Sequence, residues 1–189
     1  KLDELFRSKA SKGRMTMTVV TPDFERTLGM NMVTRGMEDT LIRITSPRKE
    51  AGISTLKKGT EMWNYLPKVK KTVRVPPSMM MGAWMGSDFT NDDLVRASSW
   101  ENDYDMAFVD GVGAGDEVCL RYTPKPSAAV TWDHIDTCFD GGTSLPHRQD
   151  FYDEKGRKAR TLHFSEVKEM GGRTIPSVMT LEPLLKQGH

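Results

Sequence analysis

The sequence lacks the features that mark several large classes of protein. It contains no run of about 18 apolar residues, so we expect no helix that spans a membrane. Lysine and arginine together number 27, against 26 aspartates and glutamates. This balance gives none of the basic excess that a nucleic-acid-binding surface needs. We therefore expect no nucleic-acid partner.

Catalytic and metal-binding motifs are missing as well. No histidine has a partner at metal-ligand spacing, and there is no Cys-x-x-Cys pair. The glycine-rich run from Gly111 to Gly115 has no helix after it, which a phosphate-binding loop requires, so we interpret it as a hairpin turn. No serine or cysteine lies in a triad pattern. We predict no catalytic residue, no metal site and no cofactor, and hence a protein that is not an enzyme.

The densest polar group is Asp133, His134 and Asp136. On a strand, Asp133 and His134 point to opposite faces and cannot act together. His134 and Asp136 share a face and could form a pair. We interpret this group as part of a surface strand or of the rim of a pocket.

Cysteine is scarce, with only Cys119 and Cys138. A hairpin centred on the loop 124–129 would set Cys119 opposite a residue near His134. Cys138 would then lie roughly 13 Å away along the strand, at about 3.3 Å per residue. That distance is too long for a disulfide, so we expect two free, buried thiols. The cysteine count itself is compatible with a reducing or an oxidising compartment.

Alternation of apolar and polar residues is the main pattern that is present. It recurs along most of the chain, for example from Met15 to Val19 and from Val130 to Asp136. A period of two indicates half-buried strands, and Gly, Pro and Asp clusters separate the segments at short intervals. We predict a mainly β protein in which an antiparallel meander forms a sandwich or a barrel.

Helical patterns are few. Residues 1–9 form an amphipathic pattern with Leu2, Leu5 and Phe6 on one face. Thr90 is a good N-cap, and Asp92 and Asp93 in the first turn complement the helix dipole, which predicts a short helix to about Ala97.

The stretch from Pro77 to Phe89, called the flap below, follows neither period. It contains Met79, Met80, Met81, Trp84 and Met85, flanked by Pro and Gly. Methionine is abundant overall, with 13 residues, and its flexible side chain suits irregular apolar surfaces. We interpret the flap as a flexible apolar segment that either fills a core or covers a pocket for a hydrophobic ligand.

Several stretches resemble the bacterial outer-membrane lipoprotein-sorting protein family, the LolA/LolB-like superfamily. They include Trp63-Asn64-Tyr65-Leu66-Pro67, followed by Met85-Gly86-Ser87-Asp88-Phe89-Thr90 and Asp93-Leu94. The block from Met85 to Thr90 is the specific one. Further matches are residues 14–32 with Arg26, residues 42–52, and residues 151–156. The sequence is most similar to the branch encoded near large inner-membrane exporters. The resemblance covers essentially residues 1–189, which we expect to form a single domain that is shorter at both ends than is usual in this branch.

The resemblance implies a strongly curved antiparallel sheet, an unclosed half-barrel, with short helices and loops covering its concave face. It implies that the protein is exported to the periplasm, its signal peptide removed, and that it binds lipoprotein acyl chains or another lipid. The implied partners include an inner-membrane transporter, and a transient contact with a membrane surface is compatible with this role. The alternative is an interaction module that carries no lipid and docks on an inner-membrane exporter.

An apolar cavity beneath the flap is the expected ligand site. Face parity and the flap sequence give the residues that we expect to line it. These are Met17, Met30, Met32, Trp63, Tyr65, Met80, Trp84, Met85 and Phe89.

Overall fold

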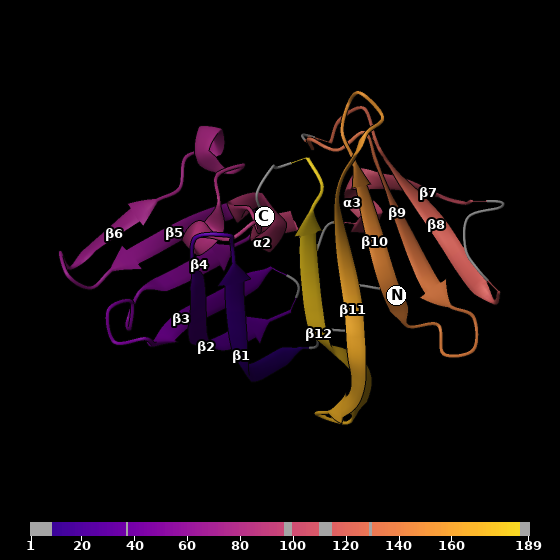
Figure 1. Cartoon of the computed structure of the whole chain (residues 1–189). Helices are drawn as coiled ribbons and strands as arrows, with labels where there is room; N and C mark the ends of the chain where they lie inside the picture. The colour runs from indigo at the N-terminus through magenta and orange to yellow at the C-terminus, as the bar shows by residue number, and fades with distance from the viewer. Residues whose placement is uncertain (1–8, 37, 97–99, 110–114, 129, 186–189) are drawn as a thin grey trace. The chain divides into compact units, whose positions relative to one another are not determined.

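The computed structural model describes residues 9–36, 38–96, 100–109, 115–128 and 130–185. The chain divides into two compact units, with the boundary between residues 98 and 99. Each unit contains one antiparallel sheet of six strands, and neither sheet closes on itself (Figure 1). The chain is therefore mainly β, antiparallel and unclosed, as the sequence predicts.

The first sheet is a simple meander in which every strand pairs with the next one in the chain. This order follows from the short turns, since neighbouring strands in sequence pair most readily when the connection is short. Its strands are β1 (Ala10–Val20), β2 (Glu25–Arg35), β3 (Asp39–Ser46), β4 (Ser54–Lys58), β5 (Glu61–Leu66) and β6 (Lys71–Arg74).

The second sheet is also a meander, in the order β12-β11-β10-β9-β8-β7. Its strands are β7 (Tyr104–Phe108), β8 (Glu117–Pro124), β9 (His134–Asp140), β10 (Pro146–Tyr152), β11 (Lys158–Met170) and β12 (Arg173–Pro183).

Helical structure in the described residues is short. Two 3₁₀ turns, η1 (Pro77–Met79) and η2 (Trp84–Gly86), lie in the flap, and α2 (Asn91–Arg96) and α3 (Trp100–Asp103) follow. No helix among these residues has the length and apolar character needed to cross a membrane. The predicted helix at residues 1–9 lies outside the described residues, except for its last position.

The start of α2 confirms the predicted N-cap. The Asp93 amide donates to the Thr90 hydroxyl at 3.1 Å, and the Thr90 amide donates to the Asp93 carboxylate at 2.8 Å. This reciprocal pair satisfies two amides that a helix start otherwise leaves without partners.

The two faces of the first sheet differ because side chains alternate along each strand. One face carries the buried residues Leu28 and Met30 of β2, Ile42 and Ile44 of β3 and Met62 of β5. The opposite face leaves Leu41 of β3 and Leu56 of β4 exposed. The first face therefore supplies the core of this unit.

The second unit has its own buried side chains. All six strands of the second sheet contribute to them. These residues are Tyr104, Tyr122, Ile135, Phe151, Leu162, Phe164 and Ile175. Trp100 adds ring contacts to Tyr104 and Tyr122, with ring centroids 5.2 and 5.1 Å apart. Offset and edge-to-face ring pairs at such distances are favourable.

The cysteine prediction was wrong, because Cys119 and Cys138 form a disulfide. The two residues lie directly opposite each other in the pairing of β8 with β9, with Cα atoms 4.1 Å apart. β9 begins only at His134, so the connection runs over residues 125–133 and is longer than predicted. The longer loop shifts the register by four residues relative to the predicted hairpin and brings the sulfurs together.

Candidate functional site

The flap lies on the apolar face of the first sheet and inserts its tryptophan there. Trp84 is 4% exposed and belongs to one buried cluster with Leu28, Met30, Ile42 and Ile44. Its indole N–H donates to the hydroxyl of Thr55 on β4 at 3.1 Å. Because a buried indole N–H needs an acceptor, Thr55 lets Trp84 enter an otherwise apolar face.

Methionines surround this cluster. Met17, Met32 and Met85 are partly buried and pack against it, together with Ile53 and Leu94. Met80 packs against a second buried pair, Met62 and Val75. The apolar face thus combines a few fully buried side chains with a ring of flexible, partly accessible methionines.

The flap is held together by its own hydrogen bonds. The Trp84 amide donates to the Phe89 carbonyl at 2.7 Å, and the Ser87 hydroxyl donates to the Trp84 carbonyl at 2.8 Å. The Asp92 amide donates to the Met80 carbonyl at 2.8 Å and ties the flap to the start of α2. The segment has no strand or long helix, as predicted, but several of its backbone groups are hydrogen-bonded.

Arg26 of β2 links the sheet to the flap. Its guanidinium donates to the carbonyl of Met85, whose backbone has a φ of 51° in the left-handed region. Glu50 lies 4.0 Å from the same guanidinium, and Gly86 packs so closely that an added Cβ would lie 3.3 Å from it. No sequence pattern predicts a role for Arg26 or Glu50. The only sign of their importance was that both lie in stretches that resemble the lipoprotein-sorting family.

A groove of about 1000 Å³ lies on the opposite face of the same sheet. Leu41, Leu56 and Trp63 pair in register across β3, β4 and β5 and form its floor, and Tyr65 lies beside them. Apart from Gly59, the other lining residues are polar or charged: Glu38, Asp39, Ser54, Lys58, Glu61 and Thr72.

The structure therefore separates the predicted lining residues into two groups. Met17, Met30, Met32, Met80, Trp84 and Met85 gather at the apolar face and the flap. Phe89 is a partly buried residue of the flap. Trp63 and Tyr65 line the groove on the other face, because residues 61, 63 and 65 of β5 point away from buried Met62.

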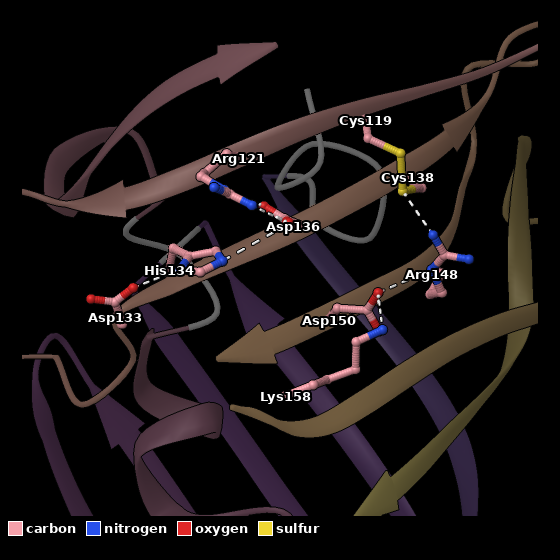
Figure 2. A network of polar contacts seen from close by, with 9 residues as sticks. All are labelled: Cys119, Arg121, Asp133, His134, Asp136, Cys138, Arg148, Asp150 and Lys158. Carbon is pink, nitrogen blue, oxygen red and sulfur yellow. Dashed lines mark hydrogen bonds and ion pairs between the residues drawn. A yellow bond between two sulfur atoms is a disulfide. The ribbon is translucent and has the colours of Figure 1, made fainter. Parts of the chain in front are cut away.

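The second unit contains a network of charged side chains on one face of its sheet (Figure 2). Arg121 of β8 binds the Asp136 carboxylate with two hydrogen bonds of 2.8 and 2.7 Å. These bonds raise the pKa of Arg121, and partial burial opposes that shift. Asp150 lies directly opposite Asp136 on β10 and contacts Arg148 at 3.2 Å and Lys158 at 2.9 Å. Each buried carboxylate thus has a cation beside it, which burial of a charge requires.

The network corrects one prediction and confirms another. Asp133 and His134 do interact, with 2.7 Å between the Asp133 carboxylate and His134 Nδ1. The prediction was wrong because β9 begins at His134, so Asp133 precedes the strand and does not follow its alternation. His134 Nε2 lies 4.0 Å from Asp136, as their shared face predicts.

Residues 36–189 match a protein-family model described as "-like: Uncharacterized protein". No curated protein matches the chain.

Several solved structures share its fold, including these three. A LolA superfamily protein from Nitrosomonas europaea is 24% identical, with a TM-score of 0.80 over 99% of this chain and 84% of that one. A DUF1329 family protein from Desulfovibrio piger is 24% identical, with a TM-score of 0.83 over 96% and 82%. An outer membrane lipoprotein-sorting protein domain from Vibrio parahaemolyticus is 23% identical, with a TM-score of 0.78 over 91% and 77%.

These likenesses confirm, at the level of the fold, the resemblance to the LolA/LolB-like superfamily that the sequence indicated. The chain belongs to the family that the matching model describes, and its fold is that of the LolA superfamily.

Proposed function

We propose that this protein binds a hydrophobic ligand, an acyl chain of a lipid or lipoprotein, on the apolar face of its first sheet beneath the flap. The observation that carries the proposal is that a loop, and not a strand or a long helix, covers this methionine-lined face. A loop can move without breaking the sheet's own hydrogen bonds. The LolA-superfamily fold supports the proposal, since the relative from Vibrio parahaemolyticus is a lipoprotein-sorting domain by name.

The ligand would contact the seven predicted residues on this side of the sheet. Met30 and Trp84 are almost fully buried, so an entering chain must displace Trp84. Burying the roughly 12 methylene groups and the terminal methyl of a myristoyl chain is worth roughly 10 kcal/mol relative to water, at about 0.8 kcal/mol for each carbon. A bilayer offers the chain a similar gain, so the protein can only exchange it with a membrane if the flap moves at low cost.

We further propose that the protein works in the periplasm as a carrier or acceptor and not as an enzyme. The disulfide between Cys119 and Cys138 supports an oxidising compartment, because such bonds persist outside the reducing cytosol. Sorting of lipoproteins between membranes is the role that fits both this compartment and an acyl-chain site.

Quenching of tryptophan fluorescence by dibrominated stearic acid tests the proposal. Bromine quenches only nearby indoles, and Trp84 and Trp63 lie on opposite faces of one sheet. We expect saturable quenching in the wild type and in Trp63→Phe, and loss of most of it in Trp84→Phe. Unbrominated stearic acid is the control for quenching that does not come from bromine.

Three results would contradict the proposal. One is the absence of saturable quenching, and another is quenching that disappears only in Trp63→Phe, which would assign the ligand to the groove. The third is quenching that both variants retain in full, which would assign it to the neighbourhood of Trp100 or Trp132. Native mass spectrometry of protein purified without detergent should also detect a co-purifying lipid.

A further inference from the structure

Glu117 lies beside the disulfide of the second unit, and His147 lies beside Glu117. Candidate ligand atoms of Glu117, Cys119 and Cys138 all lie within 4.8 Å of one another. His147 is outside this group of three, but its Nε2 atom lies 2.8 Å from a carboxylate oxygen of Glu117. The network drawn in Figure 2 borders this cluster through Arg148.

We propose that these four residues form a zinc site when the disulfide is reduced. Two thiolates, one imidazole and one carboxylate are a donor set that Zn²⁺ accepts in tetrahedral geometry. In the oxidised protein the two sulfurs are bonded to each other in the disulfide and cannot serve as thiolate ligands. The proposal does not depend on the lipid-binding function.

The strand register explains why the four residues meet. Cys119 and Cys138 are direct partners in the β8–β9 pairing, and Glu117 is two residues before Cys119, on the same face of β8. The pairing of β10 with β9 shifts between Pro146 and Arg148, and His147 lies at that irregularity. The irregularity lets the imidazole reach Glu117 across β9.

The contact between His147 and Glu117 is not a standard hydrogen bond. The Nε2 atom is buried, and it has no hydrogen-bond partner of acceptable geometry although the carboxylate oxygen is 2.8 Å away. Two ligands at about 2.05 Å from a tetrahedral zinc ion lie roughly 3.3 Å apart. A small outward movement of the imidazole would therefore bring these two atoms to the separation that two zinc ligands have.

The sulfur atoms also need only side-chain movement. Two thiolates at about 2.3 Å from zinc lie roughly 3.8 Å apart, a separation that rotation about Cα–Cβ can supply without breaking the ladder between β8 and β9. The Arg148 guanidinium donates to Cys138 Sγ at 3.3 Å. A cation at this position favours the thiolate form and offers a hydrogen bond from outside the ligand shell.

The charges and the chemistry balance. A dithiol reductant transfers two electrons and two protons to the disulfide, giving two protein thiols and one oxidised dithiol. Binding of Zn²⁺ then releases two protons from the thiols. The two thiolates, the carboxylate and Zn²⁺ carry a net charge of −1, which the cation of Arg148 neutralises.

Cobalt spectroscopy on the full chain tests the site. After reduction with a phosphine, which does not bind cobalt as thiol reagents do, Co²⁺ should give the charge-transfer and d–d bands of a tetrahedral thiolate site. One equivalent of Zn²⁺ should abolish these bands. The oxidised protein should give none.

Variants identify the ligands. Loss of a ligand should cost about 100-fold or more in Zn²⁺ affinity, since even partners outside the ligand shell cost about 10–100-fold. We expect this loss in His147→Ala and in Glu117→Gln, and no binding in the double variant Cys119→Ser/Cys138→Ser. His163→Asn is the matched control, because His163 lies on β11 of the same unit with its ring partly exposed.

Two results would overturn the proposal. One is the absence of tetrahedral Co²⁺ bands in the reduced protein. The other is an affinity that His147→Ala and Glu117→Gln leave unchanged, which would indicate thiols binding metal without a built site. Circular dichroism with and without Zn²⁺ covers the case of unfolding on reduction, since zinc should then restore the strand spectrum of the wild type but not of His147→Ala.

Discussion

At the scale of single residues, Trp84 connects the flap to the sheet. It is buried among apolar side chains of β2 and β3 and bonded to Thr55 of β4. The hydroxyl of Thr55 in turn donates to the side-chain oxygen of Asn64 at 2.7 Å, so the polar atoms beneath the flap form a short satisfied chain. Trp84 and this set of hydrogen bonds therefore hold the flap closed, together with the Arg26 contact to Met85.

The substitution Trp84→Ala should lower the free energy of unfolding by about 3–5 kcal/mol, because it removes a buried aromatic side chain and leaves a cavity. Urea denaturation followed by circular dichroism measures this loss. Met79→Ala is the control within the flap, since Met79 is 60% exposed, and its effect should stay within about 0.5 kcal/mol. Equal effects of the two substitutions would contradict the assignment of Trp84 as the anchor of the flap.

At the scale of elements, two aspartates hold the turns that follow β9 and β10. Asp140 accepts hydrogen bonds from the amide and the hydroxyl of Thr143, at 2.7 and 2.8 Å. Asp153 accepts bonds from the Arg157 guanidinium, at 2.9 and 2.7 Å, and from the amides of Lys155 and Arg157. The Thr143 bonds lower the pKa of Asp140, and the Arg157 bonds lower the pKa of Asp153.

These shifts predict a loss of stability in acid. A carboxylate whose folded pKa is depressed contributes stability above its unfolded pKa of about 3.9, and that contribution disappears as the pH falls through the folded pKa. The double variant Asp140→Asn/Asp153→Asn should therefore be less stable than the wild type near neutral pH, with the difference shrinking in this acidic range. Urea midpoints measured at a series of pH values test this. A stability difference that stayed constant as the pH fell through this range would indicate that ionisation of Asp140 and Asp153 does not stabilise the fold.

The same scale shows what the sequence could and could not predict. Alternation located most strands correctly, and the Thr90 cap located α2, because both patterns are local. Alternation also grouped Met17, Met30 and Met32 on one face. The register of β8 against β9 was wrong, because it depends on a loop whose length no local pattern fixes.

Other features of the site could not be predicted from the sequence, for related reasons. The contact between Asp133 and His134 depends on the exact first residue of β9, and strand ends are poorly defined by pattern alone. Trp63 and Tyr65 belong to a stretch that resembles the family, yet they face the groove and not the flap. A family resemblance indicates which stretches are shared with the family, but it does not indicate on which face of the sheet a side chain lies.

At the scale of the whole molecule, the chain contains two units with separate buried cores, and the disulfide lies entirely within the second. Its two cysteines are separated by 19 positions in the chain. Closing a loop of this length limits the unfolded chain and is worth roughly 3 kcal/mol at 25 °C in the chain-entropy description. The cross-link should therefore stabilise one unit much more than the other.

The double variant Cys119→Ser/Cys138→Ser should show this asymmetry in amide hydrogen exchange measured by mass spectrometry. We expect faster exchange in peptides from β8, β9 and β10, because opening that depends on unfolding of the second unit becomes more frequent. Peptides from β2 and β3 should exchange at the wild-type rate, because their protection comes from the cluster around Leu28 and Trp84. Trp84→Ala is the reciprocal control and should speed exchange in β2 and β3 while leaving β8 and β9 unchanged. If either substitution instead speeds exchange equally in both units, the two sheets unfold as a single cooperative body, and the stability of the flap and that of the disulfide hairpin are coupled.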